Sequence, residues 1–297
     1  MERVNLTEAV SLSRIIYGMW RLAEDTNTST SHVQAKIEAN LDQGITTMDQ
    51  ADIYGDYESE ALFGKTLKAA PHLKDKLEII SKCDIALVSD KYPGRRVKHY
   101  DTSSAYITAQ VENSLTLMGI EALDVLLLHR PDPLMDPAET GRTLDMLVAD
   151  GKIKSVGVSN FKPWDISLLQ SRMGTPIIAN QIEISLLAHE ALTNGDLAFA
   201  QEHEIAPMAW SPLAGGGLFN GENANLDAAL TQMAETHSAT TTQIAIAWLL
   251  AHPACILPVM GSNNLERIAE FGGAADVRLS REDWYVLYQA ALGNEVP

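Results

Sequence analysis

Eight apolar runs of strand length recur along the 297-residue chain, and each stops on or beside a polar, aromatic or glycine residue. Several are continuous rather than alternating, which is typical of strands covered on both faces in a parallel sheet. Helical patterns separate the runs, and strand then helix, repeated eight times, predicts an α/β fold of the (β/α)8 barrel type. The expected strands are Ile15–Tyr17, Ile45–Met48, Leu77–Ile80, Leu123–Leu128, Ile153–Val158, Ile177–Ile182, Ile205–Trp210 and Ile256–Met260.

Two observations weigh on the barrel prediction. The competing fold, a doubly wound dinucleotide-binding sheet, needs a G-x-G-x-x-G turn after its first strand, and Gly18-Met19-Trp20 does not supply it. Pro207 and Pro258 fall inside the last two runs and count against central strands, because proline removes a ladder donor. No linker-like stretch divides the chain, so we expect one domain over residues 1–297.

Residues typical of helix ends also lie outside the expected strands, as the barrel pattern requires. The apolar spacing over 107–118 predicts a helix that ends at Gly119, where glycine can take the left-handed conformation. Gly151 and Gly174 are expected to end the next two helices. The spacing of Ser280–Asp283 matches a capping box and predicts an extra C-terminal helix packed outside the barrel.

The composition limits the partners of the chain. A formal net charge of -17 argues against nucleic acid, because phosphate backbones attract clustered Lys and Arg. No run of about 18 apolar residues occurs, so no membrane span is expected. The two cysteines, Cys83 and Cys255, suggest no disulfide framework, and a reducing cytoplasm fits. We expect a monomer or a small homo-oligomer.

One segment departs from this acidity. The residues Lys91, Arg95, Arg96 and Lys98 form a basic patch in a connection that is long for a strand-to-helix loop. A solvated loop is the simpler interpretation. A loop that helps to hold an anionic substrate or a cofactor phosphate is the alternative, and the sequence leaves both open.

Four side chains with complementary proton chemistry stand at the ends of expected strands. Asp49 and Tyr54 follow the second strand, Lys82 the third and His129 the fourth, and a barrel brings such positions to one face. A tyrosine with an ordinary pKa of about 10 donates its proton poorly, but a lysine cation would stabilise the phenolate left behind. Asp49 could keep Lys82 charged, so we expect Lys82 and Asp49 together to lower the pKa of Tyr54. His129 could orient the same substrate oxygen. Each residue alone has an ordinary structural explanation, and their joint placement favours a proton-transfer site.

The quartet lies within the first three of a series of motifs along the chain. They are Asp49-Gln50-Ala51-Asp52-Ile53-Tyr54-Gly55, Ser81-Lys82, Leu128-His129-Arg130-Pro131, Gly157-Val158-Ser159-Asn160-Phe161, Asn180-Gln181, Trp210-Ser211-Pro212-Leu213 and Gly261-Ser262-Asn263-Asn264-Leu265-Glu266-Arg267. In these segments, from about Gly18 to Phe271, the chain resembles the aldo-keto reductase family. The resemblance implies that Tyr54 is the proton donor, with Lys82, Asp49 and His129 as its catalytic partners.

The resemblance also implies a nicotinamide cofactor, usually NADPH, bound across the barrel mouth. Ser159, Asn160 and Gln181 match positions that bind the nicotinamide carboxamide, and Trp210 matches the ring that stacks on it. The pyrophosphate would lie along Ser211, Pro212, Leu213, Gly215 and Gly217. The adenosine 2'-phosphate would meet Gly261, Ser262, Asn263 and Arg267, with Glu270 near the adenine. Met19 and Trp20 complete the expected cofactor contacts, and Trp20, Tyr54 and His129 the substrate contacts.

Two departures from the family pattern concern specificity. Gly261 replaces a lysine found in many members, which would weaken the preference for NADPH. Asp84 stands two residues after Lys82, where many members carry an aromatic residue, so a pocket wall that is either more polar or differently built is expected.

The resulting hypothesis is an NADPH-dependent oxidoreductase that reduces small aldehydes or ketones to alcohols. The alternative is an NADPH-binding regulatory or redox-sensing barrel subunit with slow turnover. A metal-dependent hydrolase is disfavoured, because no HExxH or comparable ligand spacing is present and no metal site is expected.

Overall fold

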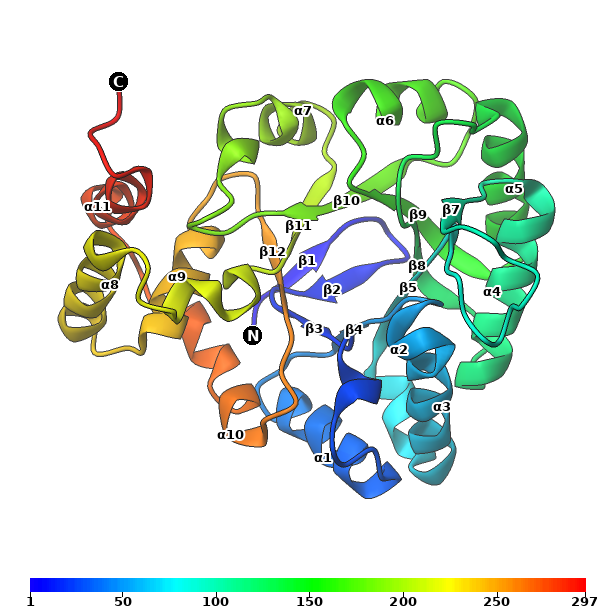
Figure 1. The fold of residues 1–297 in the computed structure, drawn as a ribbon, viewed down its shortest axis with the longest axis horizontal. Helices are drawn as coiled ribbons and strands as arrows, with labels where there is room; N and C mark the ends of the chain where they lie inside the picture. Colours follow the sequence, from blue (N-terminus) through cyan, green and yellow to red (C-terminus); the bar gives the residue numbers. More distant parts are fainter.

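The computed structural model describes residues 1–297, and eight parallel strands close into a barrel at its centre (Figure 1). In chain order these strands are β3 (Ile16–Gly18), β4 (Thr47–Asp49), β5 (Glu78–Cys83), β8 (Leu123–Leu128), β9 (Ile153–Ser159), β10 (Ile177–Glu183), β11 (Ala206–Trp210) and β12 (Leu257–Met260). Neighbours in the chain are neighbours in the barrel, and β12 pairs with β3 to close it. All eight expected strands are present, so the predicted fold class is confirmed.

The two prolines do not prevent strand formation. Pro207 lies in β11 opposite Asn180, and Pro258 lies in β12 opposite Ala209. Each proline removes one donor from its ladder, while the other residues of both strands keep the parallel pairing. Proline is therefore compatible with the parallel pairing of these short barrel strands, contrary to the expectation from the sequence.

Helices surround the barrel, one or more after each strand (Figure 1). The longer ones are α1 (Thr30–Leu41), α3 (Ser59–Ala69), α4 (Ser104–Met118), α5 (Pro137–Ala149), α6 (Pro163–Gln170), α7 (Asp196–Glu202), α8 (Ala224–His237), α9 (Thr241–Leu250) and α11 (Arg281–Leu292). The short helices are α2 (Tyr54–Tyr57), α10 (Leu265–Ile268) and the 3-10 turns η1 (Leu22–Glu24), η2 (Pro71–Lys76), η3 (Glu190–Leu192), η4 (Ala214–Phe219) and η5 (Phe271–Asp276). None of the helices has the length and apolarity that a membrane span requires.

Most of the expected helix ends are confirmed. Gly119 has a φ of 64° and ends α4, and Gly151, with a φ of 71°, follows the end of α5. The prediction for Gly174 is wrong, because α6 already ends before Ser171. The backbone N–H of Gly174 instead donates to the Asp145 carboxylate at 2.9 Å, which ties the loop after α6 to α5.

The C-terminal helix lies outside the barrel as expected (Figure 1). Ser280 and Asp283 form the capping box at the start of α11. The rings of Trp248 on α9 and Trp284 on α11 stack with centroids 4.8 Å apart. Each indole N–H donates to the backbone carbonyl of the other tryptophan, at 3.2 and 3.0 Å. This reciprocal pair fixes α11 against the barrel helices.

An N-terminal hairpin that the sequence pattern did not predict covers one end of the barrel. Its strands are β1 (Arg3–Asn5) and β2 (Ser11–Ser13). Val10 and Leu12 are buried in one cluster with residues of all the barrel strands except β4 and β9. The Arg3 guanidinium donates to Thr46 and Glu78, which lie at the amino ends of β4 and β5. The hairpin therefore covers the amino end of the barrel, on the side opposite to the carboxyl ends of the strands.

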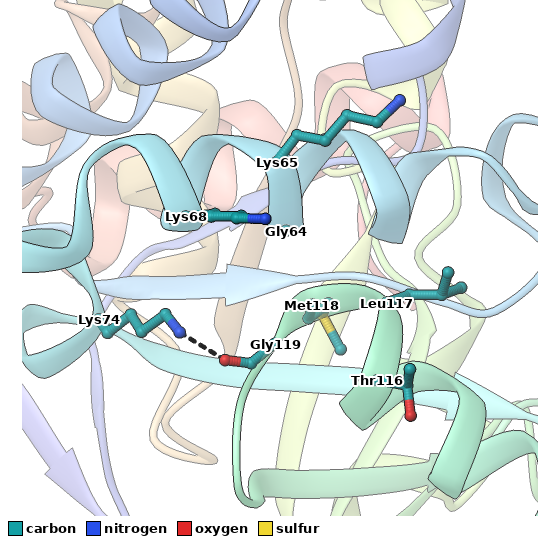
Figure 2. A pocket seen from close by; sticks show the side chains of 8 residues that line it. All are labelled: Gly64, Lys65, Lys68, Lys74, Thr116, Leu117, Met118 and Gly119. Atoms are coloured by element: carbon teal, nitrogen blue, oxygen red, sulfur yellow. Dashed lines mark hydrogen bonds between the residues drawn. The ribbon is translucent and has the colours of Figure 1, made fainter.

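Helices α3 and α4 approach each other closely at Gly64. A Cβ atom built on Gly64 would lie 1.9 Å from the carbonyl oxygen of Leu117. Gly64 and Leu117 are among the residues that line a hollow of about 280 Å³ (Figure 2), where the Lys74 ammonium donates to the carbonyl of Gly119 at the end of α4. None of the residues that line this hollow belongs to the predicted site.

We expect Gly64→Ala to lower the free energy of unfolding by about 2 kcal/mol or more. The added methyl group would clash with the backbone of Leu117 and Met118, which cannot move away as a flexible side chain can. Gly94→Ala is the matched control, since no atom lies within 4 Å of the added carbon. Urea unfolding followed by circular dichroism measures both. Equal stability of the two variants would contradict the close α3–α4 packing.

Candidate active site

The four residues of the predicted proton-transfer site meet at the carboxyl end of the barrel. Asp49 ends β4, Lys82 lies near the end of β5, His129 follows β8 and Tyr54 begins α2. The Lys82 ammonium donates to Asp49 Oδ2 at 2.6 Å and to the Tyr54 hydroxyl at 2.9 Å. Its third donor bonds the backbone carbonyl of Gln50 at 2.8 Å. All three protons of the ammonium are therefore used, and each bond has a different partner.

The carboxylate of Asp49 is fixed from both sides. Its second oxygen accepts a hydrogen bond from Gln181 Nε2 on β10 at 2.9 Å. Burial disfavours the charge of Lys82, but Asp49 and Tyr54 outweigh this effect and raise the pKa of the ammonium above its usual 10.5. Lys82 therefore stays cationic at neutral pH, although it is almost completely buried.

The pKa of Tyr54 differs from the sequence-based expectation. Burial of its hydroxyl raises the pKa above the usual 10.0, and this effect exceeds the lowering by Lys82. The charges of Asp49 and Asp52 also raise it, so the expectation that Asp49 and Lys82 together lower this pKa is wrong. The phenol keeps its proton at neutral pH, and the ammonium at 2.9 Å lies where it would stabilise the phenolate.

His129 faces Tyr54 as a neutral ring. The two ring centroids are 6.0 Å apart in an edge-on arrangement. Burial and the positive charges of Lys82, Arg130 and Lys98 hold the pKa of His129 well below its usual 6.5. Its Nδ1 atom is buried without a hydrogen-bond partner. A neutral imidazole can share a hydrogen bond with a substrate oxygen without adding a charge to the site.

The residues expected around the nicotinamide form one hydrogen-bonded network at the ends of β9, β10 and β11. The Ser159 hydroxyl donates to the carbonyl of Gln181 at 2.8 Å, and Asn160 Nδ2 donates to Ser159 Oγ at 2.8 Å. The indole N–H of Trp210 donates to Asn160 Oδ1 at 3.0 Å and holds its ring in place. The structure therefore brings these four residues together beside the catalytic quartet.

The segment after β11 has the open backbone expected of a phosphate-binding loop. Ser211 has a φ of 48°, and Gly215 and Gly216 have φ values of 64° and 100°. No atom lies within 4 Å of a Cβ built on Gly215, Gly216 or Gly217, except Ala214 Cβ at 3.9 Å from Gly217. Small residues here let the backbone approach a ligand. Pro212 is buried and Leu213 half-buried, which anchors the start of the segment.

The segment after β12 is partly engaged with the protein itself. Asn263 Oδ1 accepts from the buried Lys36 ammonium at 2.9 Å, and Asn263 Nδ2 donates to the carbonyl of Arg21 at 2.7 Å. Lys36 also pairs with Asp25. Lys36 was not predicted from the sequence, although its position between Val33 and Ile37 on the apolar face of α1 indicates a buried lysine that needs a partner. Gly261, Arg267 and Glu270 are exposed, and Ser262 is half-buried.

Two residues expected after β3 lie in different environments. Trp20 is 52% exposed, and the Arg21 guanidinium lies 5.0 Å from its ring centroid. Met19 is buried in the main core cluster. Its N–H donates to the Asp49 carbonyl at 2.9 Å, and its carbonyl accepts from the Ser59 hydroxyl at 3.2 Å. Met19 therefore has no free polar group, whereas Trp20 lies open after the carboxyl end of β3.

Asp84 does not form the polar pocket wall that its position suggested. It is fully buried, and both of its carboxylate oxygens accept the backbone N–H of Arg130 at 3.2 Å. It therefore supports the backbone directly after His129. Asp52, which the sequence analysis also missed, is buried with both carboxylate oxygens unpaired, and burial raises its pKa well above 3.8. Nowhere do three or more His, Cys, Asp or Glu side chains group as metal ligands.

Comparisons with known proteins identify the family of the chain. The model of the aldo/keto reductase family matches residues 14–290. A 6-dehydroglucose reductase from Agrobacterium fabrum strain C58 is 56% identical over 296 residues, covering 100% of both chains. The thermostable aldo-keto reductase Tm1743, solved with the inhibitor epalrestat, has a TM-score of 0.82 at 25% identity and covers 98% of this chain and 100% of its own.

A second solved structure contains a cofactor. It is an aldo-keto reductase from Klebsiella pneumoniae in complex with NADPH, with a TM-score of 0.78 and 27% identity. The alignment covers 97% of this chain and 93% of that one. The match of the family model over most of the sequence, together with a full-length relative at 56% identity, extends well beyond the site. The chain belongs to the aldo/keto reductase family.

Proposed function

We propose that the protein is an NADPH-dependent carbonyl reductase in which Tyr54 donates the proton. The observation that carries this proposal is the Lys82 ammonium, which bonds Asp49 and the Tyr54 hydroxyl at the same time. A phenol beside a permanent buried cation can lose its proton at the moment when a substrate oxygen gains negative charge. Residues 1–297 would act as one reductase unit.

The bound cofactor would supply a hydride from C4 of its nicotinamide. The carbonyl oxygen of the substrate would lie between the Tyr54 hydroxyl and the neutral His129 ring, which would orient it. As the oxygen becomes an alkoxide it takes the Tyr54 proton, and Lys82 stabilises the phenolate that remains. Asp49 keeps the ammonium in place and balances its charge. The product is the alcohol.

The cofactor assignment has support from this chain's own residues. The Ser159–Asn160–Trp210 network offers polar groups and a fixed ring beside the quartet. The glycines of η4 leave room for a backbone approach to the pyrophosphate. The exposed Arg267 is the cation available to the adenosine 2'-phosphate in the segment after β12. The related structure that contains NADPH favours the same cofactor.

The first candidate substrate is 6-dehydroglucose, an aldehyde sugar. The 6-dehydroglucose reductase from Agrobacterium fabrum is 56% identical to this chain over the full length of both proteins. We propose that the protein reduces this aldehyde, or a sugar aldehyde of similar size, to the primary alcohol.

Tyr54→Phe is expected to lower kcat for reduction by about 100-fold or more, because the variant lacks the general acid. The dissociation constant for NADPH should stay near the wild-type value. The measurement is the loss of NADPH absorbance with 6-dehydroglucose and with a panel of aliphatic, aromatic and dicarbonyl aldehydes. Tyr285→Phe, on the surface of α11, is the matched control and should keep full activity.

Two results would count against the proposal. If the Tyr54→Phe variant reduced the substrate at the wild-type rate, Tyr54 would not be the proton donor. Tight NADPH binding by the wild type without turnover on any carbonyl would instead favour the regulatory or redox-sensing alternative.

The pH dependence follows from the direction of the pKa shifts. The lowered pKa of His129 leaves the ring neutral at and above pH 6.5, and the raised pKa values of Tyr54 and Lys82 leave both groups protonated to pH 10. We therefore expect kcat/KM for reduction to be flat between about pH 7 and 9.5. Steady-state rates across this range test it, and a midpoint near pH 7 would contradict the neutral His129.

A further inference from the structure

The backbone directly after Tyr54 is strained. Gly55, Asp56 and Tyr57 have φ values of 60°, 52° and 67°, so three successive residues adopt the left-handed conformation. For Asp56 this conformation is uncommon, and for an aromatic residue such as Tyr57 it is unfavourable. Such a conformation persists only where the surrounding structure holds it. The turn that begins at the proposed proton donor therefore needs contacts that hold it in this conformation.

A loop that follows the catalytic lysine makes these contacts. Residues 87–98, which we call the clamp loop, connect the paired strands β6 (Ile85–Ala86) and β7 (His99–Tyr100). Lys91 Nζ donates to the carbonyl of Asp56 at 2.7 Å and pairs with Glu58. The hydroxyl of Ser89 donates to Asp56 Oδ2 at 3.1 Å. On the opposite side, a Cβ on Gly55 would lie 2.3 Å from Ala23 Cβ, so the turn is enclosed between η1 and the clamp loop.

Arg95 is the centre of the clamp loop. Its Nη1 donates to the Tyr57 hydroxyl at 2.7 Å and to the carbonyl of Leu87 at 3.4 Å. Its guanidinium carbon lies 3.8 Å from the ring centroid of Tyr92, and 5.7 and 5.8 Å from those of Tyr57 and Tyr106. Three tyrosines therefore surround one arginine, and both the planar guanidinium and its charge contribute to the contact.

Tyr57 connects this arginine to the strained turn. Its hydroxyl accepts a second hydrogen bond, from the backbone N–H of Leu87 at 2.9 Å. Its ring packs edge-on against Tyr92 with centroids 4.8 Å apart. Tyr57 is buried, and it is itself one of the left-handed residues of the turn. The contacts of Arg95 therefore act directly on the segment that starts at Tyr54.

We propose that Arg95 is a positioning residue for Tyr54, because it locks the clamp loop onto the left-handed turn at residues 55–57. This inference rests on the proposed function. The Tyr54 hydroxyl must stay 2.9 Å from Lys82 Nζ, and a small displacement of a reacting group can lower a rate by orders of magnitude. Two of the four cations of the basic patch, Lys91 and Arg95, are thus engaged by the protein, and Arg96 and Lys98 remain exposed.

The titratable groups that face Tyr54 belong to other elements. They are Lys82 on β5, Asp49 on β4, Asp52 before α2 and His129, which is neutral, after β8. Arg95 does not contact the Tyr54 hydroxyl, so its effect must pass through Tyr57 and the turn. Combining an Arg95 substitution with Tyr54→Phe can therefore separate an effect of Arg95 on the position of Tyr54 from a general effect on the fold.

The test uses the full-length enzyme with Arg95→Met, Arg95→Lys and the adjacent control Arg96→Met. With NADPH bound and 6-dehydroglucose saturating, Arg95→Met should lower the single-turnover rate of NADPH oxidation about 10-fold, with an unchanged dissociation constant for NADPH. Arg95→Lys should regain part of the rate, because it keeps the cation near the tyrosines. Arg96→Met should stay within about two-fold of the wild type. In the Tyr54→Phe background, Arg95→Met should cause no further loss.

Hydrogen exchange of the peptide that contains residues 54–58 gives a readout that needs no turnover. Exchange should be faster in Arg95→Met than in Arg96→Met, and Tyr57→Phe, which removes only the shared hydroxyl, should show the same direction. Equal rates and equal exchange for Arg95→Met and Arg96→Met would overturn the positioning role. A weaker NADPH affinity or a higher KM without a slower single turnover would show a ligand-binding loop instead, and would also overturn it. Absence of turnover in the wild type contradicts the proposed function alone, because the exchange comparison still decides the role of Arg95.

Discussion

An ammonium group that is almost completely shielded from solvent needs three acceptors within the protein, and this requirement organises the site. Lys82 meets it with Asp49, the Gln50 carbonyl and the Tyr54 hydroxyl. An unpaired charge at this depth would be strongly destabilising, so the three partners have to be held firmly. Gln181 holds Asp49 from the opposite side of the barrel, which links β4, β5 and β10 through one carboxylate. The same bonds that satisfy the lysine place a phenol beside a permanent cation.

Barrel closure explains how residues so far apart in the chain meet these demands. The hairpin formed by β1 and β2 covers the amino ends of the strands, and the carboxyl ends carry the quartet, the Ser159–Asn160–Trp210 network and the glycines after β11. Rigid strands supply Asp49 and Lys82, whereas Tyr54 begins the short helix α2, in the connection that follows β4. Loops are less well fixed than strands, so a strained turn after Tyr54 needs outside support. The contacts of Arg95, Lys91 and Ser89 with that turn provide it.

The sequence predicted most of the fold, because seven of the eight apolar runs stop within one residue of the end of their strand, whereas β5 continues three residues beyond its run, to Cys83. It also predicted the quartet, since residues at strand ends must converge. It could not predict features that depend on distances. The raised pKa of Tyr54 is a balance between burial and the charge of Lys82, and only the structure gives their relative size. Asp84 was misplaced because its role is a bond to the backbone of Arg130, which the pattern after β5 does not reveal. The hairpin strands are only three residues long, too short for a periodic signal.

The most direct test of the account follows the hydride itself. The protein is incubated with 6-dehydroglucose and NADPH that carries deuterium in the transferable position at C4 of the nicotinamide, and the product is analysed by mass spectrometry and NMR. Hydride transfer from the nicotinamide to the aldehyde carbon would yield glucose that is one mass unit heavier, with the deuterium on C6. Glucose without deuterium, or no reduced product from 6-dehydroglucose or any other aldehyde while NADPH is bound, would contradict the claim that the Lys82–Asp49–Tyr54 arrangement serves carbonyl reduction.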